Sequence, residues 1–152
     1  MAIKWDKLTV KSQEAVQAAV QNASENGNPE VLPLHLMAAL LEDREGVVIP
    51  VLDKIGVPVQ QLLSGVNSAI EKLPKVSGGA QPGLAQSTQK VLEQAFKEAD
   101  NFKDEYVSTE HLLLALSKAK GDPVQMALAS FGATHDAILK ASSRRWRSMR
   151  RT

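Results

Sequence analysis

The sequence predicts an all-α domain of eight helices, arranged as two copies of a four-helix unit about a pseudo-two-fold axis. Apolar residues recur with the i, i+3, i+4, i+7 spacing of amphipathic helices, and the chain matches itself when it is shifted by 76 residues. The period-two alternation of a half-buried strand is absent. The 152 residues, 43% of them hydrophobic, have the composition of an ordinary globular chain.

The internal repeat aligns residues 8–63 (copy one) with residues 84–139 (copy two) without a gap, and 13 of the 56 pairs are identical. The identical pairs are Leu8/Leu84, Gln13/Gln89, Ala19/Ala95, Ala23/Ala99, Val31/Val107, His35/His111, Leu36/Leu112, Ala39/Ala115, Leu40/Leu116, Val48/Val124, Leu52/Leu128, Gly56/Gly132 and Leu63/Leu139. We interpret this as a tandem duplication. Each copy alone would expose one face of its central helix, so we expect the copies to pack together as one globule.

Each copy is expected to contain four helices. The apolar positions of the first helix run from Leu8 to Ala23 in copy one and are repeated from Leu84 to Ala99 in copy two. The other expected ranges are Leu34–Leu41, Val47–Ile55 and Val59–Leu73 in copy one, and His111–Leu116, Val124–Phe131 and Asp136–Ala141 in copy two. Thr9 is the expected N-cap of the first helix, and Ser108 or Thr109 that of the second helix of copy two. The second helices are apolar on all sides, which places them at the centre of the domain. Gly56 and Gly132 are expected to end the third helices in the left-handed conformation.

The domain boundaries follow from the repeat and from two changes in composition. We expect one domain over residues 1–142, with repeat one at 8–73, a Pro- and Gly-rich linker at 74–83 and repeat two at 84–142. Residues 143–152 form a separate basic tail with five of the six Arg. Because the whole chain has a net charge of +1, residues 1–142 carry −4. Such a tail could contact phosphates or anionic lipid, and a disordered or non-native end is the alternative.

The sequence carries no motif for catalysis. A G-x-x-x-x-G-K-[ST] phosphate loop, an H-E-x-x-H pair and a G-x-S-x-G turn are all absent, and there is no Cys. His35 and His111 are repeat mates, so each is expected to fill an equivalent site at a helix start rather than to bind a metal. Paired carboxylates such as Asp104 and Glu105 are expected to be solvated surface charges. We therefore expect no enzymatic activity, no metal site and no cofactor in this chain.

The N-terminal residues indicate neither export nor membrane insertion. Lys4, Asp6 and Lys7 interrupt the apolar run that a signal peptide needs. The longest apolar stretch, Leu36–Leu41, is six residues long, against about 20 for a spanning helix. We therefore expect a cytoplasmic protein that binds no membrane.

Four separated segments resemble, in order, the N-terminal domain of the ClpB family of AAA+ disaggregases. They are KLTVKSQEAVQAA (Lys7–Ala19), NPEVLPLHLMAALL (Asn28–Leu41), IEKLPKVSG (Ile70–Gly78) and DEYVSTEHLLLAL (Asp104–Leu116). The resemblance covers residues 3–141 and implies an eight-helix, pseudo-symmetric domain tethered to a hexameric ATPase ring. ATP and Mg²⁺ would then be cofactors of the parent protein and not of this part. After Lys140 the sequence departs from the family pattern.

The resemblance implies a domain that binds unfolded or aggregated polypeptides weakly and helps deliver them to the pore of the ATPase ring. The related ClpA and ClpC unfoldases use the same domain to dock adaptor proteins, which is the alternative function. Besides clients, the implied partners are the ring of the parent hexamer and a co-chaperone system, but not nucleic acid. Thr9, Asp104 and Glu110 match family positions associated with chaperone activity, so they are the candidate substrate-binding residues. Their repeat mates differ in type and are Ala85, Asn28 and Leu34.

Overall fold

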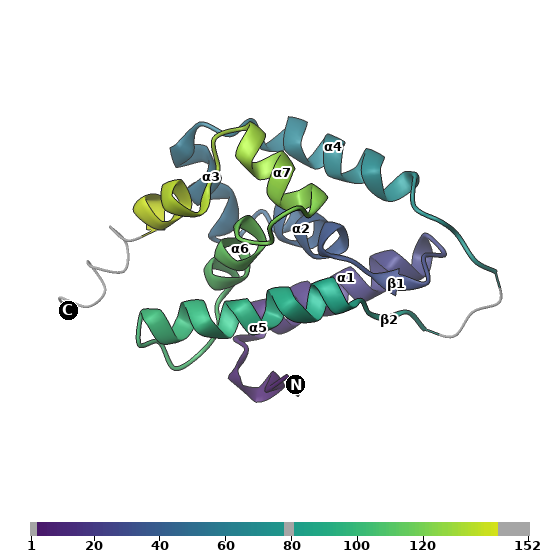
Figure 1. Cartoon of the computed structure of the whole chain (residues 1–152), viewed down its shortest axis with the longest axis horizontal. Coiled ribbons are helices and arrows are strands. Elements are labelled where there is room, and N and C mark those ends of the chain that lie inside the picture. The colour runs from purple at the N-terminus through teal and green to yellow at the C-terminus, as the bar shows by residue number, and fades with distance from the viewer. Residues whose placement is uncertain (1–2, 78–80, 143–152) are drawn as a thin grey trace.

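The structure is a computed structural model, and it describes residues 3–77 and 81–142. Its elements in chain order are η1 (Trp5–Lys7), α1 (Val10–Glu25), β1 (Glu30–Val31), α2 (Pro33–Glu42), α3 (Val48–Ile55), α4 (Val59–Glu71), β2 (Gly83–Leu84), α5 (Gln86–Asn101), α6 (Thr109–Ser117) and α7 (Pro123–Ser130). Another helix covers residues 135–142. The part of the chain described here thus contains the eight α-helices that the repeat predicts, four in each copy. Figure 1 shows how they are arranged.

The two apolar helices, α2 and α6, lie at the centre of the molecule. In Figure 1 they lie between α1 and α5 on one side and α4 and α7 on the other. Every residue of α6 is buried, as are eight of the ten residues of α2. Their leucines, including Leu36, Leu40, Leu112 and Leu113, belong to one apolar cluster that draws residues from both copies. Each fully buried leucine contributes about 1.5–3 kcal/mol, so this shared core is the main source of stability.

The helix ends follow the predicted capping residues. Thr9 caps α1, and its Oγ1 accepts a hydrogen bond from the Ser12 N–H at 3.1 Å. Gly56 follows α3 with φ of +98°, and Gly132 follows α7 with φ of +81°. These positive φ values cost little only in glycine, which explains why this pair is identical in the two copies.

Two short parallel pairings, which the sequence pattern does not predict, join the copies. In the first, Leu8 pairs with Val107. In the second, β1 pairs with β2, with Val31 opposite Leu84. Each pairing joins the residue before the N-cap of the first helix of one copy to the residue before the N-cap of the second helix of the other. We call the two pairings the seams. A two-residue strand is too short to show period-two alternation, which is why no strand was expected.

The two seams are held by equivalent hydrogen bonds. The Val107 carbonyl accepts from the Thr9 N–H at 3.0 Å and from Ser12 Oγ at 2.8 Å. The Val31 carbonyl accepts from the Ala85 N–H at 3.0 Å and from Thr88 Oγ1 at 2.7 Å. The donors in the second seam are the repeat mates of those in the first. The first helix of each copy is therefore positioned by the main chain of the other copy.

The loop after the first helix has the same backbone path in both copies. Gly27 has φ of +69°, and its repeat mate Lys103 has φ of +59°. In copy one this loop also holds the start of the linker, because the Gly27 carbonyl accepts from the Val76 N–H at 2.8 Å. The predicted basic tail, residues 143–152, lies outside the described residues.

Candidate functional site

A histidine organises a polar site at the start of each central helix, as the repeat predicts. In copy one, His35 Nδ1 accepts a hydrogen bond from the Leu32 N–H at 2.9 Å. The ring therefore carries its proton on Nε2, which donates to Asn28 Oδ1 at 2.8 Å. Asn28 in turn donates from Nδ2 to the Pro74 carbonyl at 3.2 Å. The buried imidazole is thus fully satisfied in its neutral form, and it caps α2 where Leu32 has no polar side chain to do so.

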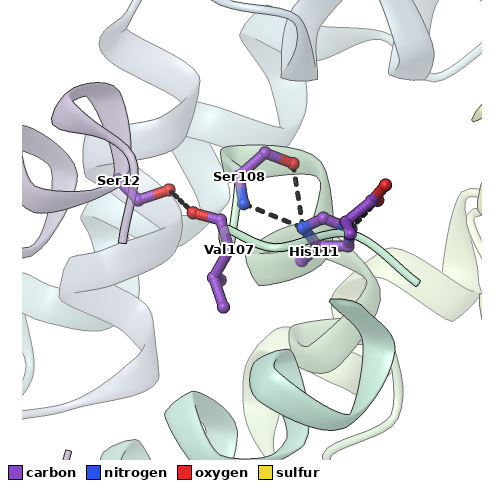
Figure 2. A network of polar contacts seen from close by, with 5 residues as sticks. Ser12, Val107, Ser108 and His111 are labelled. Atoms are coloured by element: carbon purple, nitrogen blue, oxygen red, sulfur yellow. Dashed lines mark hydrogen bonds and ion pairs between the residues drawn. The ribbon is translucent and has the colours of Figure 1, made fainter. Parts of the chain in front are cut away.

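The equivalent site in copy two has a carboxylate in place of the amide. The Ser108 N–H donates to His111 Nδ1 at 2.8 Å, and Ser108 Oγ also lies 3.1 Å from Nδ1. His111 Nε2 donates to Asp104 Oδ2 at 3.0 Å. Figure 2 shows this cluster beside the Ser12 and Val107 contact of the first seam. The prediction that Asp104 is a solvated surface charge is wrong, because its carboxylate orients the buried His111 ring.

Burial sets the protonation state of both rings. Desolvation by burial lowers the pKa of His35 from its ordinary value. Burial also lowers the pKa of His111, against the opposing effects of the Asp104 hydrogen bond and the charges of Asp104 and Glu98. A proton on Nδ1 would also set an N–H against the N–H of Leu32 or Ser108. Both rings are therefore neutral at pH 7, and they serve as helix-start caps, as predicted.

The three candidate substrate-binding residues lie on two segments that meet at the first seam. The half-buried Thr9 bonds through its N–H to Val107, while Asp104 precedes Val107 by three residues. Glu110 follows Val107 by three residues and is buried in the first turn of α6, where the helix dipole favours an anion. The structure therefore brings the two segments that carry these residues together at one seam. A role of these residues in client binding stays a prediction.

An apolar groove, which the sequence analysis did not identify, runs between α4 of copy one and α7 of copy two. Its volume is about 450 Å³. The lining residues are Leu34, Gln61, Leu62, Ser64, Gly65, Val66, Ala69, Pro123, Ala127 and Phe131, and none of them is charged. Small residues at Gly65, Ala69 and Ala127 leave the space open. The spacing of these small residues is visible in the sequence, but it predicts a groove only once α4 is known to pack beside α7.

The described residues show neither a metal centre nor a membrane helix. No group of three or more His, Cys, Asp or Glu side chains among residues 3–77 and 81–142 could hold a metal ion. Over the same residues, no helix has both the length and the apolar character needed to cross a bilayer.

Residues 7–131 match the protein family described as the Clp repeat (R) N-terminal domain. The chaperone protein ClpB of Rhodopirellula baltica is 39% identical over 143 residues, which cover 94% of this chain and 16% of that protein. ClpB of Corynebacterium glutamicum is 41% identical over 135 residues, covering 88% of this chain and 16% of that protein. The chain therefore spans about 16% of the length of these relatives.

Several solved structures share the fold. The Hsp104 N-terminal domain from Candida albicans superposes with a TM-score of 0.79 at 23% identity, covering 91% of both chains. The N-domain of ClpV from Vibrio cholerae has a TM-score of 0.78 at 19% identity, covering 95% of this chain and 87% of that one. A ClpV N-domain solved in complex with a VipB peptide has a TM-score of 0.74 at 21% identity, covering 95% and 89%. The predicted all-α fold is confirmed.

Proposed function

Because the chain belongs to the family of Clp repeat N-terminal domains, with ClpB chaperones among its relatives, we propose that it binds unfolded or aggregated polypeptides. In the parent protein it would help deliver them to a hexameric ATPase ring in the cytoplasm, with a co-chaperone system as a further partner. The sequence carries no phosphate-binding loop. ATP and Mg²⁺ would therefore act in other parts of the parent protein.

The uncharged groove between α4 and α7 is the observation that carries this proposal. Leu34, Leu62 and Val66 are buried at its base, while Ala69 and Phe131 are only half-buried. An extended apolar segment laid along the groove would remove apolar surface from water without desolvating a charged group. The ClpV N-domain solved with a VipB peptide supports the proposal, since a domain of this fold there holds a peptide.

Binding in such an open groove is expected to be weak. We expect dissociation constants between about 10 µM and about 1 mM, which correspond to about 7 to 4 kcal/mol. Weak binding suits a domain that must release its client to the pore. NMR titration with a permanently unfolded protein is the direct test, and the largest shifts should fall on groove residues such as Ala69 and Ala127.

A matched pair of variants on α4 locates the site. Ala69→Glu places a carboxylate in the groove, and we expect client binding to weaken at least about fivefold, because that charge would be desolvated by the client. Ser68→Glu adds the same charge at the neighbouring exposed residue outside the groove and should change binding less than about twofold. No shifts at millimolar client, or equal losses for the two variants, would refute the proposal.

Thr9, Asp104 and Glu110 are proposed as additional client-binding residues. Glu110 is the repeat mate of Leu34, which lines the groove, so the two copies differ at equivalent places. Glu110→Gln keeps the size of the side chain and removes its charge. If Glu110 contacts clients, binding should weaken several-fold while the melting temperature falls by only a few degrees. Unchanged client binding would leave Glu110 with a structural role alone.

Docking of a folded adaptor is the alternative function. It is favoured by two charged clefts, one lined by three lysines and the other by three carboxylates. Contacts between charged rims weaken as salt concentration rises, whereas binding in the apolar groove does not. Titration of an uncharged apolar client at low and high salt therefore tests the groove without a contribution from the charged clefts.

A further inference from the structure

The two copies carry clefts at equivalent places. One cleft, of about 580 Å³, lies between α5 and the end of α6 in copy two. The other, of about 320 Å³, lies between α1 and the end of α2 in copy one. Under the 76-residue shift, the lining residues Ala39 and Leu40 of the smaller cleft correspond to Ala115 and Leu116, the first of which lines the larger cleft. The duplication thus produced two versions of one cleft.

The two clefts have opposite charge. Three lysines and one aspartate line the cleft of copy two, a net charge of +2, whereas one lysine and three carboxylates line that of copy one, a net charge of −2. The reversal occurs at equivalent positions, which are Glu14/Lys90 and Glu42/Lys118. Solubility alone does not require the charge to change sign at two pairs of equivalent positions in the same cleft.

The lysines of the basic cleft are available to a partner. Within residues 3–77 and 81–142, neither Lys90, Lys118 nor Lys120 lies within 4.0 Å of a carboxylate, and all three are exposed. In the acidic cleft, by contrast, Lys11 lies 3.4 Å from Asp43. The aspartate of the basic cleft, Asp122, is engaged in capping α7, since its Oδ1 accepts from the Val124 N–H at 2.9 Å.

We propose that the basic cleft between α5 and α6 binds an acidic segment of an extended polypeptide. The carboxylates of such a segment would contact Lys90, Lys118 and Lys120, and small apolar side chains between them would contact Val91 and Ala115 on the floor. Gln86 offers its amide group to the segment's main chain, and Gln94 offers its amide oxygen, because Gln94 Nε2 already donates to Glu98 Oε2 at 2.7 Å. In the described part of the chain this lining holds no arginine and no aromatic ring, the groups that best grip nucleic-acid phosphates and bases, so a peptide is the better fit.

This site goes beyond the apolar groove, because it recognises charge and uses other side chains. The two sites adjoin at Pro123, which lines both. One chain with an acidic stretch beside an apolar stretch could therefore occupy both sites.

The test measures fluorescence anisotropy of a labelled peptide of alternating Glu and Ala, at about 50 mM and about 500 mM salt. We expect binding at low salt, at least tenfold weaker binding of the same peptide with Gln for Glu, and a marked loss at high salt. Lys90→Glu/Lys118→Glu copies the residues of copy one into the cleft and should weaken binding at least tenfold. Ala69→Glu in the apolar groove should change the affinity for this peptide less than twofold. The proposal for the basic cleft and the proposal for the apolar groove can therefore be refuted separately.

A second double variant controls for the overall charge. Lys72→Glu/Lys75→Glu makes the same charge change at exposed lysines outside both clefts and should weaken binding less than twofold. Equal losses for the two double variants would overturn the proposal. So would an oligothymidine strand that competes for Lys90 and Lys118 and binds more tightly than the Glu peptide.

Discussion

Replacing Thr88 by Val tests how much the seams contribute to stability. Val has nearly the shape of Thr, so the substitution removes the hydrogen bond from Thr88 Oγ1 to the Val31 carbonyl, 2.7 Å long and buried, without opening a cavity. The Val31 carbonyl keeps its bond from the Ala85 N–H and is not left unsatisfied. The loss should therefore be that of one buried hydrogen bond, about 1 kcal/mol, or about 2–4 °C in melting temperature for a chain of this size.

Urea unfolding followed by circular dichroism measures this loss. Ser130→Ala is the matched control, because Ser130 Oγ donates the same kind of bond to the Ala127 carbonyl at 2.7 Å, but on the surface. We expect it to change the free energy of unfolding by less than about 0.5 kcal/mol. Ser12→Ala in the first seam should cost about 1 kcal/mol, and the double variant with Thr88→Val about 2 kcal/mol, with the slope m unchanged.

Two results would refute this reasoning. If Thr88→Val lowers the free energy of unfolding no more than Ser130→Ala does, the buried seam hydrogen bond stabilises the fold no more than a hydrogen bond on the surface. If a seam variant lowers m or splits the transition in two, the copies unfold separately and are not interlocked.

Three more predictions concern the helix starts, the core and the loops. Asp104→Asn should lower the pKa of His111 further, because it removes the negative charge that opposes the effect of burial. Below about pH 6.5 the unfolded chain then takes up a proton that the folded chain does not, so the free energy of unfolding of the variant should fall more steeply than that of the original between pH 7.5 and 5.5. Urea titrations measure this, and parallel curves would contradict it. Leu113→Ala should cost about 2.7–5 kcal/mol in the same assay, since Leu113 is fully buried, and a cost below about 1 kcal/mol would contradict the central place of α6. Gly27→Ala should cost about 1 kcal/mol because of its φ of +69°, whereas Lys103→Gly at the equivalent loop should not destabilise the fold; equal losses would show that φ does not decide the effect.

The sequence predicts the helices well because their signals are local. The apolar stripes, Thr9 as a cap and Gly56 as a stop each depend on residues within one or two turns, and the repeat supplies the pseudo-symmetry. The repeat also contains identical pairs whose structural role is visible only in the fold. Gln13 and Gln89, for example, are identical because each side chain donates to the carbonyl of the seam residue five positions earlier, at 3.1 Å and 3.2 Å.

The functional surfaces are harder to predict because they depend on contacts between distant segments. The hydrogen bond that His111 donates to Asp104 crosses a loop whose shape the residue types do not fix. To predict the apolar groove, one must know which edge of α4 faces α7. The apolar stripe of α4 is too wide to determine that edge from the sequence. The reversed charge of Lys90 and Lys118 is visible in the aligned repeat, but only the fold puts both at one cleft.

The seams also bear on what a single copy could do alone. A chain containing only one copy would have one seam carbonyl, equivalent to that of Val31, and one hydroxyl donor, equivalent to that of Thr88, but no second copy to pair with them. One side of its central helix would be exposed to water. Two such chains could form both seams only by associating as an isologous dimer, in which the two seams are identical contacts related by the two-fold axis. Their stability would then fall on dilution, as it does for obligate dimers. Joining the copies in one chain removes that dependence on concentration, and it frees each copy to acquire its own surface while the seams stay the same.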